Sequence, residues 1–363
     1  MKLLWISRYV GNLNGYRPEG EILIDLKKAG VDVTFMGHAD DTYLERITKH
    51  GIAVVDYQTP ESKLSWDAIK QIRAELKRGK YDVVHAFQGK TISAMLMAAI
   101  GIKVKTVAYR GQTGNIFRHD PSSYLTMLSP RLDAITCVAQ AIEDDLRVRV
   151  WNQNNPKITT IYKGHNVDWY QRQPKDRAKM GIPEDAFVLG FSANVRPRKG
   201  IHVLIEAANY LPKDANIHIL LMGHGTDGDD IRQLCDATHL GAKLHTLGFR
   251  KDIIELTSMC DATTLPTTKR EGFSRSIVES QSMEIPAVVS DTGGNAEIVA
   301  DGKTGFVVPP SDAKALAEAI EKLYNDREMC KQFGRNSRQR IATHFNHDLT
   351  VERYLAFYHE LMV

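Results

Sequence analysis

The segment EGFSRSIVE, residues 271–279, combines two carboxylates with a glycine and the expected start of a helix. It follows the run DATTLP, which is typical of a buried strand, and Ser274 is a suitable N-cap residue. We therefore expect Glu271 in a loop and Glu279 inside a helix, roughly 10 Å apart. Free N–H groups at the start of that helix would hold a phosphate between the two acids, and Gly272 would let the main chain approach it. The pair suits a nucleoside diphosphate, and two solvated surface acids are the alternative.

Three cations lie in a turn between an expected strand and the helix that begins near Gly200. Arg196 and Arg198 offer forked hydrogen bonds, and Lys199 offers a point charge, which together would neutralise a diphosphate. A solvated basic turn is the simpler alternative.

Two further motifs resemble binding signals of other protein classes. Gly223, Gly225 and Gly228 satisfy G-x-G-x-x-G, which alone indicates a dinucleotide site. We reject that interpretation because the motif follows the second strand of its sheet, and the next strand does not end in an acid. Asp227 and Asp229 form a D-x-D pair, but they head a helix and are better explained as acids that cap it and complement its dipole. We predict no obligatory metal.

Six blocks occur in one order from residue 192 to about residue 326: SANVRPRKG, GHGTDGDD, LGFRKDI, EGFSRSIVE, TGGNAEIV and TGFVVPP. In them the chain resembles the family 4 retaining glycosyltransferases, and the likeness is weaker in the first half. The resemblance implies an α/β fold of GT-B type, with two Rossmann-like, doubly wound parallel-sheet domains facing across a cleft. It also implies sugar transfer from a nucleotide sugar with retention and without metal.

The resemblance assigns roles to individual residues. Arg198 and Lys199 would hold the donor diphosphate and stabilise the leaving group, Glu271 would lie against the donor sugar, and Glu279 would accept from the ribose hydroxyls. The family's upstream arginine is replaced by Asn194, for which Arg196 would compensate. The other expected donor-binding residues are Gly15, Gly223, Gly272, Phe273, Ser274 and Arg275. The loop at residues 292–295, TGGN, should abut the Glu271 loop.

The first half departs from the family at two places. The family has a histidine beside the transferring sugar, and Arg110 stands there, so Arg110 is the fourth catalytic candidate. His119 and Arg118, in the same polar loop, are candidates on the acceptor side. The first loop reads GNLNG instead of containing a Gly-Gly pair, and Gly11 and Gly15 are its candidates for the donor phosphates.

Length and pattern predict two domains. The 363 residues are 43% apolar and 25% charged, as in ordinary globular proteins. We expect an acceptor domain at residues 1–170, a nucleotide-sugar domain at 171–344, and a helix at about 345–363 that returns to the first domain. The expected strands are 2–7, 31–36, 53–55, 82–87, 104–109, 134–138 and 159–162, then 186–192, 216–222, 243–246, 262–265 and 287–290. The helix at residues 64–79 carries Trp66, Ile69, Ile72 and Leu76 on an expected apolar stripe.

Composition also limits compartment and partners. The four scattered cysteines indicate reduced, buried thiols and a cytoplasmic protein, and residues 3–6 are too short for a signal peptide or membrane span. Residues 1–170 contain 23 Lys and Arg against 18 Asp and Glu. That excess is too small for nucleic-acid binding, but it suits an anionic acceptor or peripheral contact with the inner face of the cell membrane.

The sequence therefore favours a retaining glycosyltransferase whose co-substrate is a nucleotide sugar, UDP-linked rather than GDP-linked, with no other cofactor. The acceptor would be a glycan or glycolipid in bacterial cell-surface polysaccharide or lipopolysaccharide synthesis. Three alternatives stay open: a GT-B nucleotide-sugar epimerase, an NAD-dependent oxidoreductase using the GHGTDG loop, and a non-catalytic sugar-nucleotide binder.

Overall fold

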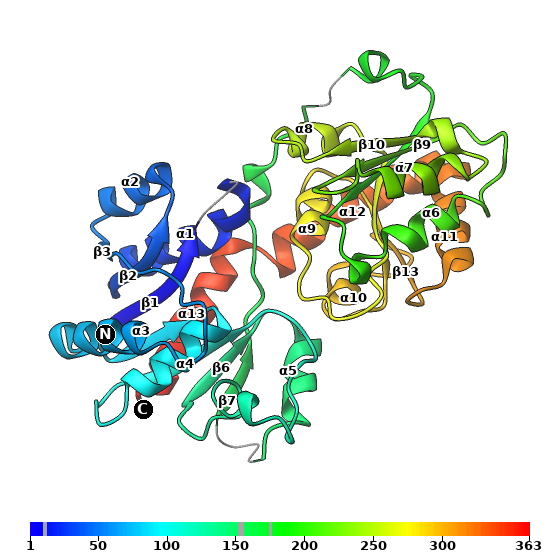
Figure 1. Cartoon of the computed structure of the whole chain (residues 1–363). Helices are drawn as coiled ribbons and strands as arrows, with labels where there is room; N and C mark the ends of the chain where they lie inside the picture. The colour runs from blue at the N-terminus through cyan, green and yellow to red at the C-terminus, as the bar shows by residue number, and fades with distance from the viewer. Residues whose placement is uncertain (10–12, 152–155, 174–175) are drawn as a thin grey trace. The chain divides into compact units, whose positions relative to one another are not determined.

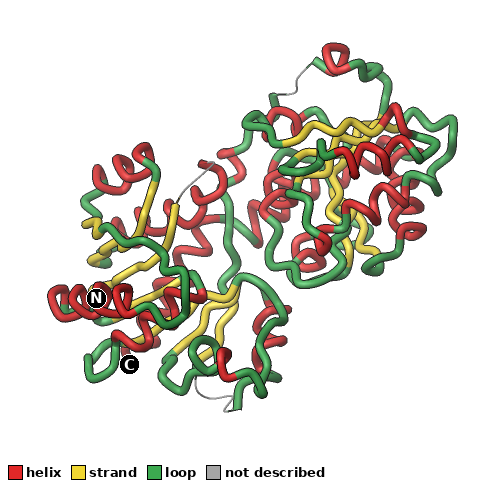
Figure 2. Tube along the Cα trace, viewed as in Figure 1, coloured by secondary structure: helices red, strands yellow, loops and turns green. Residues whose placement is uncertain are grey.

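The computed structural model describes residues 1–9, 13–151, 156–173 and 176–363 (Figure 1). The chain divides into two units: unit 1 comprises residues 1–164 and 347–363, and unit 2 comprises residues 165–346. Each unit contains one sheet in which every strand pair is parallel, flanked by helices (Figure 2). Parallel strands joined by helices form doubly wound α/β layers, so the prediction of two Rossmann-like, parallel-sheet domains is confirmed.

Unit 1 has a seven-stranded sheet in the order β3-β2-β1-β4-β5-β6-β7. Its strands are β1 (Lys2–Tyr9), β2 (Asp32–Ala39), β3 (Ala53–Val55), β4 (Val83–Ala86), β5 (Lys105–Arg110), β6 (Ala134–Cys137) and β7 (Lys157–Thr160). Its helices are α1 (Leu13–Lys28), α2 (Asp41–Lys49), α3 (Trp66–Gly79), α4 (Gly89–Ala98), α5 (Gln140–Arg147) and α13 (His347–Met362), with a 3-10 turn η1 (Pro121–Ser123). The strand order reverses between β1 and β4, and open sheets bind ligands at such a point.

Unit 2 has a six-stranded sheet in the order β10-β9-β8-β11-β12-β13. Its strands are β8 (Phe187–Ser192), β9 (Ile217–Met222), β10 (Leu244–Gly248), β11 (Ala262–Leu265), β12 (Ala287–Ser290) and β13 (Gly305–Val308). Its helices are α6 (Ile201–Ala207), α7 (Asp229–Asp236), α8 (Ile253–Ser258), α9 (Arg275–Ser282), α10 (Asn295–Ile298), α11 (Ala313–Asn325) and α12 (Arg327–His344). Its 3-10 turns are η2 (Val167–Trp169), η3 (Arg177–Met180), η4 (Pro197–Lys199) and η5 (Gly241–Lys243). The order reverses between β8 and β11. The edge strand β13 was not among the expected strands.

The chain returns to unit 1 through its last helix, α13. Aromatic side chains of α13, including Tyr354 and Tyr358, are buried in the same core as β1. The hydroxyl of Tyr358 lies 2.7 Å from Nδ1 of the buried His85. Thr350 Oγ1 accepts a 2.9 Å hydrogen bond from the Gly164 N–H, which ties α13 to the last residue before unit 2.

The predicted domain boundary at residue 170 lies inside unit 2. His165 N–H donates to the carbonyl of Phe345 at 2.9 Å, and the ring of Tyr170 packs with Met283 and Ile285. These contacts hold residues 165–170 to unit 2, and the apolar pattern alone gave no sign of them.

Helix α3 differs from its predicted pattern at one residue. Ile69, Ile72 and Leu76 are buried as expected, but Trp66 is 69% exposed, so its assignment to the apolar stripe is wrong. Trp66 is the first residue of the helix, and its position lies about 60° beyond the edge of the buried arc.

The structure bears on two expectations, one about the cysteines and one about membrane-spanning helices. All four cysteines are free and buried, as expected from their apolar surroundings. Among the helices of the described residues, none combines the length and apolar character that crossing a membrane requires.

Candidate functional site

The carboxyl edge of the unit 2 sheet gathers the predicted cations and acids. Strands β8 and β11 are adjacent and parallel, as are β11 and β12, so the loops that follow all three strands leave the same edge. These loops carry Lys199, Glu271 and the TGGN sequence respectively. A strand pairing between segments far apart in the chain thus brings the predicted residues together.

Lys199 and Glu271 form a largely buried ion pair. Lys199 Nζ lies 2.7 Å from Glu271 Oε2, which also accepts from Thr267 Oγ1 at 3.0 Å. The Gly272 N–H donates to the other carboxylate oxygen at 3.2 Å. Burial alone would raise the pKa of Glu271, but the Lys199 charge and these hydrogen bonds outweigh it and lower the pKa. Glu271 is therefore ionised at neutral pH.

The other two cations of the turn have different surroundings. Arg198 Nη1 donates to the carbonyl of Arg270 at 2.8 Å, and the Thr268 N–H donates back to the carbonyl of Arg198 at 2.8 Å. These bonds join the turn to the residues just before Glu271. Arg196 is exposed at the N-cap of η4.

Close main-chain contacts join the TGGN loop to the Glu271 loop, as expected. The Gly294 N–H donates to the carbonyl of Gly272 at 2.7 Å. Gly293 has φ of 53°, and a Cβ on it would lie 2.1 Å from the carbonyl oxygen of Glu271. The position therefore requires glycine for its conformation and for the space beside it.

Replacing Gly293 with alanine should destabilise the protein by about 2 kcal/mol or more, because the new methyl group must displace the Glu271 main chain. Chemical denaturation measures the loss. Gly302→Ala is the matched control: its φ is 66°, but nothing lies within 4 Å of a Cβ there. Its cost should be limited to about 1 kcal/mol. Equal losses would show that the space beside Glu271 is not restrictive.

Glu279 is buried inside α9 and lacks hydrogen-bond partners for one oxygen. Its Oε1 lies 3.3 Å from Arg275 Nε, but the geometry does not make a hydrogen bond. Burial raises the pKa of Glu279 to about 7, against an opposing effect of the Arg275 charge. The alternative of a solvated surface acid is wrong for Glu279. A buried carboxylate with an unused oxygen can accept hydrogen bonds from hydroxyl groups.

The start of α9 lies between the two glutamates in the sequence. Ser274 occupies the N-cap position, as predicted, but its side chain accepts no hydrogen bond from the helix. Its hydroxyl lies 3.4 Å from that of Ser276. The N–H groups of the first turn therefore receive no cap from Ser274. Phe273, expected at the donor, packs edge-on against Phe345 at a centroid distance of 5.2 Å.

The loop after β9 contacts the loop after β8. Gly223 has φ of 140°, and a Cβ on it would lie 2.2 Å from the carbonyl oxygen of Ala193. Asn194 Oδ1 accepts from the His224 N–H at 3.0 Å. The glycine motif therefore positions the loop that bears the cations. Asp229 lies in the first turn of α7, as the helix-dipole interpretation of the D-x-D pair expects. Gly228 occupies the N-cap position, so the interpretation of Asp227 and Asp229 as capping acids is wrong.

An aromatic pair that was not predicted from the sequence lies at the same edge of unit 2. The ring of His224 stacks on Phe249 with a centroid distance of 4.3 Å and an interplanar angle of 8°. Both rings are exposed and follow neighbouring strands, β9 and β10. A ring within two residues of the end of each strand is the signal that would have found them.

The remaining candidates lie in unit 1. Arg110 ends β5, is half-buried, and donates through Nη2 to the carbonyl of Gly114. Burial lowers its pKa, an effect opposed by the charge of Asp145. Gly15 is exposed in the first turn of α1, and Gly11 lies outside the described residues. A pocket of about 270 Å³ is lined by Phe87, Gly89, Ile92, Tyr109, Arg110, Gly111, Gln112 and Met127.

The two acceptor-side candidates have local contacts of their own. Arg118 donates to the carbonyls of Arg149 at 2.7 Å and Val148 at 3.0 Å, and it lies over the Trp151 ring. These contacts give its guanidinium a structural role. His119 is exposed and stacks on Phe117.

A second ion pair, which the sequence did not indicate, lies at the carboxyl edge of the unit 1 sheet. Lys163 Nζ bonds to Glu19, which also accepts from Ser7 Oγ at 3.3 Å. Burial alone would lower the pKa of Lys163, but Glu19 and Tyr109 raise it overall. The partners are 144 residues apart, so no local motif could reveal the pair.

Across the part of the chain that the structure describes, no three His, Cys, Asp or Glu side chains are grouped to hold a metal ion.

Comparison with known proteins agrees with this geometry. Residues 172–340 match the family model "Glycosyl transferases group 1", and residues 21–169 match "Glycosyltransferase Family 4". The second half of the chain thus belongs to the group 1 glycosyl transferases, and the first half matches the family 4 model. The two models occur in tandem and follow the division into units, so each unit matches one of them.

One relative of this chain is the putative glycosyltransferase EpsD of Bacillus subtilis, which is 34% identical over 193 residues. Another is the capsular polysaccharide biosynthesis glycosyltransferase CapM of Staphylococcus aureus, which is 30% identical over 237 residues. The match with EpsD covers 52% of this chain and 50% of EpsD, so the chain spans about half the length of that relative. The match with CapM covers 61% of each chain. The N-acetyl-alpha-D-glucosaminyl L-malate synthase of Bacillus anthracis is 22% identical over 88% of this chain and 84% of its own length.

Solved structures show the same fold at low identity. A glycosyltransferase from Rickettsia africae matches with a TM-score of 0.83 at 21% identity, covering 99% of this chain and 98% of that one. Anabaena Alr3699/HepE, solved in complex with UDP, matches with a TM-score of 0.79 at 22% identity, covering 99% and 100%. Both are consistent with the GT-B fold.

Proposed function

We propose that this protein transfers a sugar from a nucleotide sugar to a glycan or glycolipid acceptor, with the donor held by unit 2 and the acceptor by unit 1. The observation that carries the proposal is the Lys199–Glu271 pair beside the start of α9, with the buried Glu279 in the same helix. Cations, uncapped N–H groups and an under-bonded carboxylate are the groups that a nucleoside diphosphate requires.

In this proposal the main catalytic effect is stabilisation of the leaving group, which is the nucleoside diphosphate. As the bond from the sugar to the diphosphate breaks, negative charge grows on the phosphate oxygens, and Arg198 and Lys199 stabilise it. The partial positive charge at the start of α9 adds to their effect. Because these groups neutralise the diphosphate, the reaction needs no metal. Glu271, held ionised by Lys199, accepts from hydroxyls of the donor sugar, and Glu279 accepts from the ribose.

Retention of configuration, a UDP-linked donor and a cell-surface acceptor extend the proposal. The family resemblance supports retention. The neighbour solved with UDP supports the uridine donor, and the CapM name supports a bacterial polysaccharide acceptor. We place the protein in the cytoplasm, with peripheral contact to the membrane that contains a lipid-linked acceptor.

The test is a proton NMR time course with a panel of UDP-sugars and GDP-sugars and candidate lipid-linked acceptors. We expect transfer from a UDP-sugar, a product whose anomeric configuration equals that of the donor, and activity that survives EDTA. Isomerisation of the donor without an acceptor would indicate an epimerase. Thermal protection by NAD but not by UDP would indicate an oxidoreductase. Loss of activity in EDTA would return the D-x-D pair to consideration.

A further inference from the structure

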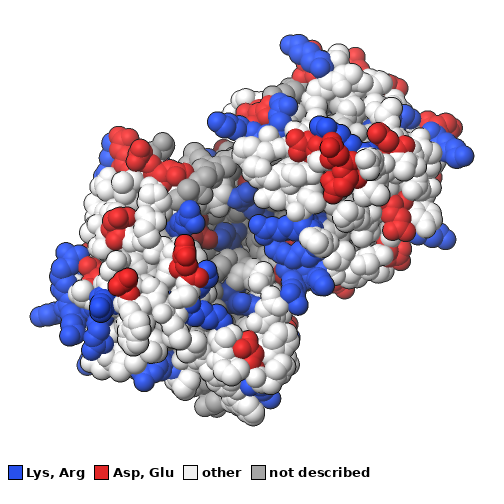
Figure 3. Space-filling model, viewed as in Figure 1, with Lys and Arg blue, Asp and Glu red and all other residues white. Residues whose placement is uncertain are grey.

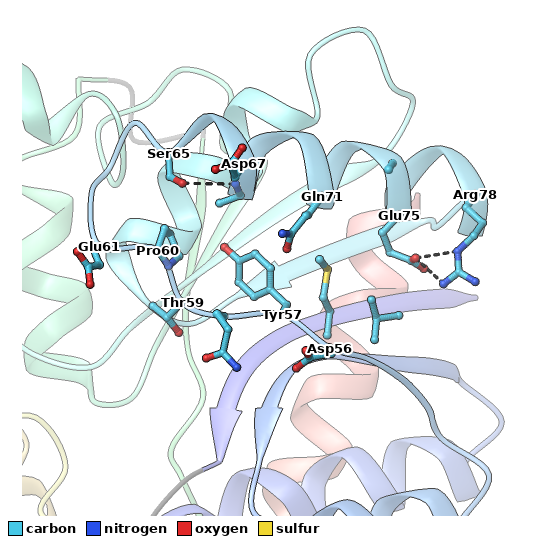
Figure 4. A pocket seen from close by; sticks show the side chains of 15 residues that line it. Asp56, Tyr57, Thr59, Pro60, Glu61, Ser65, Asp67, Gln71, Glu75 and Arg78 are labelled. Carbon is cyan, nitrogen blue, oxygen red and sulfur yellow. Dashed lines mark hydrogen bonds and ion pairs between the residues drawn. The ribbon is translucent and has the colours of Figure 1, made fainter.

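Helix α3 of unit 1 has three distinct faces. Its buried face, with Ile69, Ile72 and Leu76, packs into unit 1. A second face lines a pocket of about 750 Å³ together with the segment that follows β3 (Figure 4). Figure 4 shows Asp67, Gln71 and Arg78 on this side, at spacings of four and seven residues. The third face is formed by Trp66, Lys70, Arg73 and Lys77, which recur at i, i+4, i+7 and i+11.

The third face combines exposed apolar side chains with cations. Trp66 is 69% exposed, and Leu64, just before the helix, is 56% exposed. Arg73 Nη1 donates to the carbonyls of Ala98 and Ile100 at 2.7 and 2.6 Å, which places the exposed Ile100 beside the stripe. We call these six residues, Leu64, Trp66, Lys70, Arg73, Lys77 and Ile100, the α3 patch. Lys and Arg atoms gather over this part of unit 1 in Figure 3.

The charges of α3 are separated between its faces. The acid Asp67 lies on the pocket side, and Glu75 is buried, where Arg78 and Tyr81 bond to it. The stripe from Trp66 to Lys77 therefore contains no acid of α3. A surface that is cationic along one line, with exposed apolar side chains at its start and beside it, is complementary to an anionic, partly apolar partner.

The composition of the α3 patch distinguishes among partners. Protein interfaces are depleted in lysine, and this face carries Lys70 and Lys77. Phosphate recognition in nucleic acids gives no reason to expose Leu64 and Ile100. Tryptophan at the head of a lysine stripe is the arrangement found at lipid headgroups, where the ring enters the interface and the ammonium groups meet anionic phosphates.

We propose that the α3 patch docks unit 1 on an anionic lipid surface, with Trp66 and Leu64 entering the headgroup layer. The inference rests on the proposed function, because it would hold the acceptor-binding unit where a lipid-linked acceptor is found. The cations of the stripe supply most of the attraction, so binding weakens as salt screens them.

Vesicle co-sedimentation tests the proposal with the full-length protein. We expect binding to vesicles of phosphatidylcholine with 30% phosphatidylglycerol, and at least tenfold weaker binding to pure phosphatidylcholine or in 0.5 M NaCl. Lys70→Glu with Lys77→Glu should reduce binding to the anionic vesicles at least 50-fold, and Trp66→Ser at least fivefold. A blue shift of Trp66 fluorescence with vesicles should accompany binding.

Trp151→Ser is the matched control, because Trp151 is a 68% exposed tryptophan of the same unit outside the α3 patch. It should leave vesicle binding unchanged. A loss with Trp151→Ser but not with Trp66→Ser, or binding to heparin without binding to vesicles, would overturn the proposal. Each variant must keep the melting shift that UDP produces in the wild type. If UDP gives the wild type no shift, the proposed function fails independently of the vesicle result.

Discussion

Replacing Lys199 with alanine should lower kcat at least 100-fold, a loss of about 3 kcal/mol in transition-state stabilisation. The cation is buried beside Glu271, so no solvent ion can replace it at the developing charge of the diphosphate. The affinity for the donor should fall less than kcat, because the charge on the phosphate grows as the bond breaks. Steady-state kinetics with the donor and acceptor identified in the NMR panel measures both.

Lys199→Ala also leaves Glu271 buried without a cation, which should cost about 3 kcal/mol of stability. The double variant Lys199→Ala with Glu271→Gln removes the unpaired charge, so it should recover stability but not turnover. Lys314→Ala, which removes an exposed lysine of α11, is the control and should change neither stability nor turnover. If the double variant recovered turnover together with stability, Lys199 would have a structural role only.

Replacing Glu279 with glutamine should stabilise the empty protein while it weakens nucleotide binding. The pKa of Glu279 is raised to about 7, so at pH 8 the carboxylate is ionised although it is buried, which lowers the free energy of unfolding. Removing that charge should raise the free energy of unfolding by about 2 to 3 kcal/mol at pH 8. The same change should weaken UDP binding by about 2 kcal/mol, because the charged acceptor for the ribose hydroxyls is lost.

The pH dependence gives a second readout of the same group. A raised native pKa means that the proton-linked stability is fully present below the ordinary glutamate pKa and is lost as pH rises through about 7. The stability difference between Glu279→Gln and the wild type should therefore be small near pH 5 and reach its full value near pH 8. Glu318→Gln, at an exposed glutamate of α11, should show no such trend. A glutamine variant that is less stable at pH 8 would contradict the assigned burial cost.

The fold was predictable because its signals are local. Short β-branched runs alternate with helical periodicity through both halves, and this pattern alone indicates two parallel sheets. The strand β13 was not predicted because its four residues, which lie between Thr304 and two prolines, were assigned to a sequence motif and not to a strand. Trp66 was assigned to the apolar stripe because spacing alone does not show how wide the buried arc of a helix is, and Trp66 lies about 60° beyond that arc.

The candidate site was predictable to the extent that it lies in short motifs. Lys199, Glu271 and the TGGN loop were expected at one edge, and the parallel pairing of β8, β11 and β12 brings their loops there. The pairing of Lys199 with Glu271, and of Lys163 with Glu19, depends on contacts between distant segments that no spacing encodes. The burial of Glu279 depends on how α9 packs. These contacts and this burial determine the ionisation of the side chains concerned, and they exist only in the folded chain.

Calorimetric titration of UDP into the wild type and into Glu279→Gln at pH 6 and pH 8 tests the account most directly. We expect one UDP site per chain, with wild-type binding at least fivefold tighter at pH 8 than at pH 6, because only the ionised carboxylate accepts both ribose hydroxyls. The Glu279→Gln variant should bind more weakly and lose this pH dependence. Absence of binding heat with UDP and GDP alike, or affinities that the substitution leaves unchanged at both pH values, would contradict a nucleotide site at α9.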